Sequence, residues 1–303
     1  MADASEGDAL ALLSEARTLV DRELEACAVR MATSMAPPLG DALAYALRSP
    51  GKRVRPALVL AAYRAAGGRS PGISGVATAV EIVHTYSLVH DDLPCMDDDE
   101  VRRGRPTTHL AFDVATATRV GYLLVPVAAE ELGRAGRELG LAPDTIHCLA
   151  RALFEAGGIQ GMVGGQWMDL EAEGRRLDLP ELTAVHRGKT GALIRASVML
   201  GALAAGADPD ALEGYRRFGD EIGLAFQVAD DVLDATASSE ALGKTAGRDA
   251  ELAKSTYVGL LGVAGARQAA LRHQELGLQA LANAGLPSES LATLARYIVT
   301  RTS

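Results

Sequence analysis

The amino-acid sequence predicts an all-α protein. Apolar residues recur at three- and four-residue spacing in most segments, as in residues 9–29 and 271–286, while alternating runs of Val, Ile and aromatic residues are scarce. Hydrophobic residues make up 48% of the chain but aromatic residues only 4%, and Ala and Leu are abundant. This composition suits closely packed helices, so we expect a bundle of helices with almost no sheet.

Short stretches rich in Gly and Pro separate the predicted helices from one another. They lie at 35–40, 48–51, 66–72, 93–95, 140–144, 206–210 and 285–290. None of them is long enough to link two domains, so residues 1–303 are expected to form one domain.

Charge and cysteine content narrow the class of protein. The net charge of -9 argues against a general attraction to nucleic acid or to an anionic membrane. Cys27, Cys95 and Cys148 are widely spaced, which suggests neither a disulfide framework nor a zinc site. The chain has no basic leader and no apolar run of about 18 residues. We therefore expect a cytoplasmic protein without a nucleic-acid partner or stable membrane insertion.

The first of two acidic motifs follows an apolar segment and begins with Asp91 and Asp92. Pro94 has no N–H to donate and pushes its predecessor out of helical geometry, so the helix should end near Asp92. The turn that follows is expected to bring Asp97 back toward Asp91. A compact group of carboxylates results.

The second acidic motif contains Asp230, Asp231 and Asp234, and the apolar helix before it is expected to end at the first two. Asp230, Asp234 and Gln227 share one helical face. Crowded carboxylates repel unless a cation lies among them, and oxygen ligands favour Mg²⁺ or Ca²⁺. Mg²⁺ usually completes its shell with water and substrate phosphates. For either motif alone, a solvated helix end remains the alternative. The "HDD" at 90–92 could also suggest the His-Asp pair of a metal phosphohydrolase, but the other histidines are not at the spacing of metal ligands.

Basic residues lie close to the first acidic motif. Lys52 and Arg55 are three apart, and Arg102, Arg103 and Arg105 follow the acids directly. A guanidinium group can donate two parallel hydrogen bonds to the oxygens of one phosphate. Surface salt bridges are an alternative explanation for arginine clusters. The "GKT" at 188–190 lacks the earlier glycine and strand of a P-loop. The inferred ligand has at least two polyanionic groups and an apolar body.

Seven motifs together resemble those of the trans-isoprenyl diphosphate synthase family, over nearly the whole chain and in the family's order. They are "GKRVRP", "HDDLPCMDDDEVRRGRPTTH", "GGQWMDL", "HRGKTGALI", "FQVADDVLD", "LGKTAGRDAELAKSTY" and "RYIVTRTS". The resemblance implies mostly antiparallel helices around a deep central cavity, the isoprenoid synthase fold, in a homodimer. It also implies about three Mg²⁺ ions at a site that condenses isopentenyl diphosphate with C5 and C10 allylic diphosphates.

The resemblance assigns roles by position. The implied principal metal ligands are Asp91, Asp97 and Asp230, and the supporting ones are Asp92, Asp231 and Asp234. The implied contacts of the allylic diphosphate are Arg102, Lys189 and Lys244, and Lys254 is a further implied diphosphate contact. Those of isopentenyl diphosphate are Lys52, Arg55, His84 and Arg103, with Arg301 closing over them. Oxygens at Lys189, Thr190 and Gln227 would stabilise the carbocation. A core histidine at 84 and a cap or core amide at 227 are the structural alternatives.

The residues before Asp91 bear on product length. Tyr86 stands five residues before it and small Ser87 follows, a pattern that resembles bacterial farnesyl diphosphate synthases. We therefore expect farnesyl diphosphate as the main product. On an ideal helix Tyr86 lies about 140° around from Asp91, so helix geometry alone does not decide. A geranylgeranyl diphosphate synthase, a class I terpene cyclase and a non-catalytic subunit of a heteromeric synthase are the alternatives. Ala253, Val258 and Trp167 depart from the family pattern, and Trp167 is expected in the core.

Overall fold

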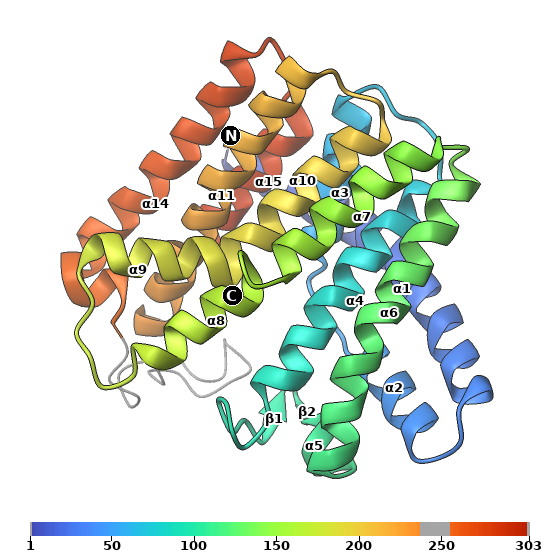
Figure 1. Cartoon of the computed structure of the whole chain (residues 1–303). Helices are drawn as coiled ribbons and strands as arrows, with labels where there is room; N and C mark the ends of the chain where they lie inside the picture. The colour runs from blue at the N-terminus through green and yellow to red at the C-terminus, as the bar shows by residue number, and fades with distance from the viewer. Residues whose placement is uncertain (1, 237–254, 302–303) are drawn as a thin grey trace.

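The computed structural model describes residues 2–236 and 255–301, and nearly all of them are helical, which confirms the predicted fold class (Figure 1). The helices are α1 (Ala2–Ser34), α2 (Leu39–Leu47), α3 (Val54–Ala65), α4 (Ile73–Asp91), α5 (Thr108–Ala111), α6 (Val114–Glu138), α7 (Pro143–Gly157), α8 (Met162–Glu171), α9 (Leu179–His186), η1 (Arg187–Gly191), α10 (Ala192–Ala204), α11 (Pro209–Thr236), α14 (Tyr257–Asn283) and α15 (Glu289–Thr300). No helix in the described ranges is both long and apolar enough to cross a lipid bilayer.

The helix boundaries follow the Gly and Pro stretches closely. Every one of the seven predicted breaks separates two elements, and α4 ends at Asp91 as expected. The prediction for the second acidic motif is wrong, because α11 continues to Thr236 and holds Asp230 and Asp231 in its interior. The reason is local: residues 232–236 include neither Gly nor Pro, so nothing stops the helix at Asp231.

Helix α4 lies inside the bundle. It packs along α6 and also against α3 and α10, while α11 runs beside α14 (Figure 1). Most of its residues from Ile73 to Val83 are buried, whereas His84, Tyr86, Ser87 and His90 near its end are only partly buried. The buried half anchors the helix in the main apolar core. The other half carries the polar groups of the first acidic motif.

A two-stranded hairpin follows the end of α4 and was not predicted. Strands β1 (Val101–Arg102) and β2 (Arg105–Pro106) are antiparallel, and they lie beyond α4 and close to α5 (Figure 1). The two turn residues, Arg103 and Gly104, have φ of 54° and 73°. Positive φ at both positions defines a type I′ turn, whose twist suits a tight hairpin. Arg102 is the last residue of β1, and Arg103 is the first residue of the turn.

The segment η1 is a π-helical turn between α9 and α10. Two close backbone contacts enclose it. A Cβ on Gly165 of α8 would lie 2.0 Å from the Lys189 nitrogen, and a Cβ on Gly223 of α11 would lie 2.7 Å from the Gly191 Cα. Only glycine lets the flanking helices approach η1 this closely. π-Turns are frequent at functional sites, and this one presents the side chains at 189 and 190.

A buried ion pair fixes the segment before α3. The Arg53 Nη1 atom donates to the Glu81 carboxylate at 2.6 Å, and both side chains are only 3% exposed. Its other nitrogens donate to Asp21 at 2.8 Å and to the Ser49 carbonyl at 2.8 Å. Arg53 therefore joins α1, α4 and the 51–56 segment, and this anchors the predicted phosphate contacts on either side of it.

Arg53→Ala should lower the free energy of unfolding by about 3–5 kcal/mol, because it leaves the Glu81 carboxylate buried without its partner. Urea denaturation measures the change. The control is Arg64→Ala, which removes the half-exposed pair of Arg64 with Glu15 and should cost less than about 1 kcal/mol. Equal losses in the two variants would contradict the anchoring role of Arg53.

Candidate functional site

The turn after α4 brings two carboxylates of the first acidic motif together. The Asp97 N–H donates to the Asp91 carbonyl at 2.9 Å, which confirms the predicted return of the chain. Burial raises the pKa of Asp91 to about 6, with the Lys189 ammonium opposing this rise and the Asp97 carboxylate adding to it. The Asp91 carboxylate is thus held where negative charge is costly. A cation at this turn would offset that cost.

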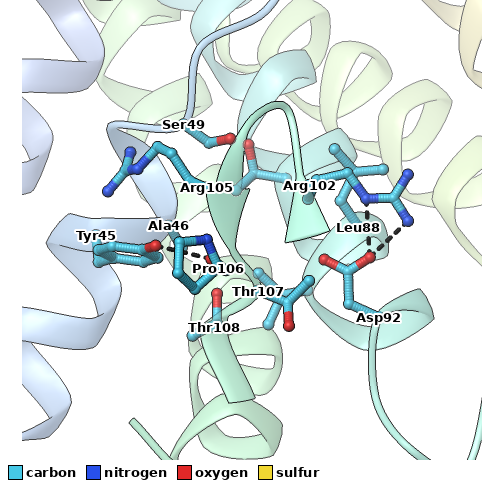
Figure 2. A pocket seen from close by; sticks show the side chains of 12 residues that line it. Tyr45, Ala46, Ser49, Leu88, Asp92, Arg102, Arg105, Pro106, Thr107 and Thr108 are labelled. Atoms are coloured by element: carbon cyan, nitrogen blue, oxygen red, sulfur yellow. Dashed lines mark hydrogen bonds and ion pairs between the residues drawn. The ribbon is translucent and has the colours of Figure 1, made fainter. Parts of the chain in front are cut away.

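Asp92 faces Arg102 of the hairpin (Figure 2). Two Arg102 nitrogens, Nε and Nη2, donate to one Asp92 oxygen at 2.8 and 2.5 Å. The same Nη2 also reaches Asp99 at 2.5 Å. Arg105, on the other strand, stacks over the ring of Tyr45 with its guanidinium carbon 4.0 Å from the ring centre. Asp92 therefore orients Arg102, and Arg105 secures the hairpin to α2.

The second acidic motif lies on α11. The Asp230 carboxylate accepts a hydrogen bond of 2.6 Å from Arg301, just after α15. Asp230 remains accessible, with 42% of its side chain exposed, while Asp234 is buried one turn further along. The most accessible carboxylate of this motif is thus the one that the sequence assigns as a principal metal ligand.

Asp231 is held by groups from two other elements. One of its oxygens accepts from the Tyr257 N–H at 2.8 Å and lies 3.3 Å from the His186 Nε2 atom. The His186 and Tyr257 rings are stacked, with centres 5.6 Å apart. The Tyr257 hydroxyl is 2.6 Å from that of Thr183. Asp231 therefore ties the start of α14 to the end of α9.

Five basic side chains assemble near α4 and α11, as the sequence predicts for four of them and suggests for the fifth. They are Lys52, Arg55, His84, Arg103 and Arg301. Burial, followed mainly by neighbouring guanidinium groups, lowers the pKa of His84 well below its ordinary value. Burial also lowers the pKa of Lys52, Arg55 and Arg103. Neutral His84 accepts a hydrogen bond of 3.3 Å from Arg103, which places the imidazole proton on Nδ1. This contact places His84 within the group of cations and also satisfies its ring nitrogen, so the alternative of a hydrogen-bonded core histidine stays open.

This group of cations is incompletely neutralised. The Nε atom of Arg55 is buried and has no hydrogen-bond partner among the described residues. The Phe226 ring lies between two guanidinium groups, 4.2 Å from that of Arg301 and 5.9 Å from that of Arg55. A buried donor without an acceptor is costly. An anionic ligand fits this cluster because it would satisfy that donor and reduce the repulsion between the cations.

Helices α8 and α11 hold the side chains of η1. Lys189 donates to Asp169 at 2.6 Å, and Thr190 donates to the Gln227 amide oxygen at 2.7 Å. The sequence did not single out Asp169, although it lies in the motif "GGQWMDL". Gln166, in the same motif, is buried with neither amide atom hydrogen-bonded among the described residues. Its burial could not be read from the motif alone.

The structure places the remaining predicted residues as follows. Tyr86 is partly buried and packs against the main core, and the Ser87 hydroxyl donates to the His84 carbonyl at 2.9 Å. Lys244 and Lys254 lie outside the described residues. The prediction that Trp167 is a core residue is wrong, because its side chain is 60% exposed on α8. It occupies an outer position of a helix whose inner face meets η1.

The polyprenyl synthetase family model matches residues 36–283, which include the acidic and basic motifs of this site. The chain belongs to the polyprenyl synthetase family. It is 43% identical to the farnesyl diphosphate synthase of Escherichia coli over 268 residues, or 87% of this chain and 89% of that one. It is 41% identical to the heterodimeric geranylgeranyl pyrophosphate synthase large subunit 1 of Arabidopsis thaliana, covering 86% of this chain and 71% of that one.

Solved structures of related proteins agree with the fold. The geranyltransferase of Helicobacter pylori, complexed with magnesium and isoprenyl diphosphate, matches with a TM-score of 0.80 at 32% identity. The match covers 96% of each chain. These relatives show that the chain is a prenyltransferase with the all-α isoprenoid synthase fold.

The acidic residues fit a hard cation that substrate helps to hold. Within residues 2–236 and 255–301, no three acidic, His or Cys side chains converge closely enough to bind a metal ion. Asp91 nevertheless sits beside Asp97 with a raised pKa, and Asp230 is accessible. Mg²⁺ is commonly bound by one or two carboxylates together with water and phosphate oxygens. The donor set therefore suits Mg²⁺ in company with a diphosphate.

Asp91→Asn should stabilise the metal-free protein at pH 7–8. The ordinary pKa of 3.8 rises to about 6 on folding, so folding favours the protonated acid. The stability this adds is complete below about pH 4 and is lost as the pH rises to about 6. Above that, removing the charge should raise the free energy of unfolding by about 1–3 kcal/mol.

Thermal unfolding in EDTA at pH 4 and pH 8 tests this prediction. The control is Asp98→Asn, an exposed position in the same loop whose φ of 50° asparagine tolerates. The Asp91→Asn gain should be confined to the higher pH. An unchanged melting temperature at pH 8 would contradict the raised pKa.

Proposed function

We propose that the protein condenses isopentenyl diphosphate with C5 and C10 allylic diphosphates to give mainly farnesyl diphosphate. The observation that carries the proposal is the incompletely neutralised group of cations, in which the Arg55 Nε atom has no partner among the described residues. One member of the group, His84, lies two turns before Asp91 on α4, and another, Arg301, donates to Asp230. One diphosphate needs direct cationic contacts and the other a metal bridge. The identity to farnesyl diphosphate synthases supports the same reaction.

The basic group is proposed to hold isopentenyl diphosphate. Arg55 offers its unpartnered Nε, and Arg103 and Lys52 add charge from the turns on either side. Neutral His84 keeps Arg103 in place and offers its Nδ1 proton as a further donor. Arg301 closes the group from the α15 side while it remains stacked on Phe226.

The allylic diphosphate is proposed to lie against the acidic turn. Asp91, Asp97 and Asp230 would hold about three Mg²⁺ ions, with Asp92, Asp231 and Asp234 in support. When bound, Mg²⁺ supplies the positive charge that stabilises the leaving diphosphate. Lys189 and Arg102, with Lys244 and Lys254, add direct contacts to its oxygens. Asp169 and Asp92 hold the first two of these cations in position.

The reaction is proposed to proceed through an allylic cation. Once the C–O bond ionises, the paired Thr190 hydroxyl and Gln227 amide oxygen direct their dipoles at the cation. The double bond of isopentenyl diphosphate attacks, and the released diphosphate removes the final proton. Water would capture the cation, so the bound substrates are expected to exclude it from the site.

The assembly and location remain proposals. We propose that residues 1–303 form one domain and that two chains form a homodimer, as the family resemblance implies. All three cysteines are free, and the cysteine spacing is the basis for proposing a cytoplasmic location.

Purified protein with Mg²⁺, isopentenyl diphosphate and dimethylallyl or geranyl diphosphate should give mainly C15 product, because the site is proposed to stop growth there. Chromatography of the dephosphorylated products measures chain length. Asp91→Asn is the inactive control, since it should remain folded while losing a principal metal ligand. Mainly C20 product would favour the geranylgeranyl alternative, and no condensation with any primer would refute the proposed function.

Tyr86→Ala should lengthen the product. If the Tyr86 ring blocks the growing chain, its removal should raise the C20 to C15 ratio by about tenfold, the effect of a barrier of roughly 1.4 kcal/mol. Tyr86→Phe keeps the ring and should leave the ratio unchanged. The same C15 product from Tyr86→Ala would show that another group limits growth.

A further inference from the structure

His90 lies between two tyrosine rings at the α4–α6 interface. Tyr86, one turn earlier on α4, meets it edge to face, with ring centres 5.1 Å apart and an angle of 72°. Tyr122 of α6 meets its other side, with centres 5.6 Å apart at 88°. Residues four apart on a helix are neighbours, so the first contact follows from the spacing along α4. The second depends on how α6 packs.

Helix α6 fixes the position of the His90 ring. The His90 Nε2 atom donates to the Thr118 carbonyl at 3.1 Å. The ring also occupies the space left by a missing side chain, because a Cβ on Gly121 would lie 1.9 Å from the same nitrogen. Any other residue at 121 would collide with the imidazole. The ring is therefore held from one side by a hydrogen bond and from below by bare backbone.

We infer that His90 is a positioning residue that sets product length by holding the Tyr86 ring in place. The inference rests on the proposed role of Tyr86. Tyr86 has a neighbour of fixed position on the α6 side, and that neighbour is itself clamped to α6. An edge-to-face contact of this kind favours one ring position over others by about twofold to tenfold. The position of α6 thereby determines the position of His90, and His90 in turn determines that of the Tyr86 ring.

The main test compares His90→Ala with wild type in the condensation assay, using Mg²⁺, isopentenyl diphosphate and geranyl diphosphate. The C20 to C15 ratio at equal turnover should rise by about twofold to tenfold. The matched control is His147→Ala, an exposed histidine on α7, which should leave the ratio unchanged. Calorimetric titration with Mg²⁺ and substrate analogue should show unchanged affinity, since the role of His90 is not to bind metal.

Two further variants separate ring contact from simple loss of volume. His90→Phe keeps an aromatic edge beside Tyr86 and should restore a ratio near that of wild type. His90→Leu fills much of the space without an aromatic ring and should resemble His90→Ala. It also serves if His90→Ala does not fold. Equal lengthening in the phenylalanine and leucine variants would overturn the inference.

Gly121→Ala gives an independent approach from α6. The added methyl group should displace the imidazole and raise the C20 to C15 ratio in the wild-type background. In the His90→Ala background nothing remains to be displaced, so the same substitution should have no further effect on the ratio. Additive effects in the two backgrounds would count against His90 as the connecting group.

Thermal unfolding provides a test that needs no substrate. The losses in melting temperature of Tyr86→Ala and His90→Ala should be less than additive in the double variant, because each removes the same contact. If Tyr86→Ala lengthens the product while His90→Ala and Gly121→Ala do not, the inference fails and the proposed function stands. If Tyr86→Ala leaves the product at C15, the role of Tyr86 fails and the inference with it.

Discussion

The arrangement of the site depends on backbone contacts through glycine on both sides of η1. Gly165 of α8 meets Gly188, and Gly223 of α11 meets Gly191, at distances that leave no space for a Cβ. One helical turn beyond each of the flanking glycines stands the side chain that grips η1. Asp169 follows Gly165 and holds Lys189, while Gln227 follows Gly223 and holds Thr190. The same close approach thus fixes the position of η1 between α8 and α11 and the direction in which Lys189 and Thr190 point.

Charge is distributed unevenly along α4. Near its middle His84 is neutral and belongs to a group of cations, and two turns later Asp91 belongs to a group of carboxylates. Two turns correspond to about 10 Å, so the groups are near enough to bind the two ends of a reacting pair. Among the described residues, the Arg55 Nε atom has no hydrogen-bond partner, and burial raises the pKa of Asp91. We expect that folding stability is lower at both of these positions on α4, the interior one at His84 and the C-terminal one at Asp91, because each is arranged to bind a ligand.

Much of the fold could be predicted because helix ends are determined locally. Pro94 ends α4 at the expected place, and the lack of such a residue after Asp231 lets α11 continue. The hairpin at 101–106 could not be predicted, because arginine, glycine and proline show no alternating apolar pattern. Its type I′ turn depends instead on two positive φ angles, one of them at Arg103.

The site was less predictable than the fold. Sequence motifs place residues of the right chemistry in order, but partners come from distant segments. Asp92 accepts a hydrogen bond from Arg102. Asp231 accepts one from the Tyr257 N–H and contacts His186. Asp169 lies 20 positions before Lys189 on another helix. Such pairs depend on how the helices pack against one another, and the spacing of residues along one helix gives no information about that packing.

The absence of side chains at the glycine contacts has a consequence for how the protein can change in evolution. The side chain of a lysine or threonine on η1 can be replaced without a clash between backbones. Any substitution of Gly165 or Gly223 places a Cβ within 3 Å of the η1 backbone. The aromatic contacts between α4 and α6 are made by side chains instead, so substitutions there need not move η1. With the proposed role of Tyr86, product length could thus change while η1 keeps its structure.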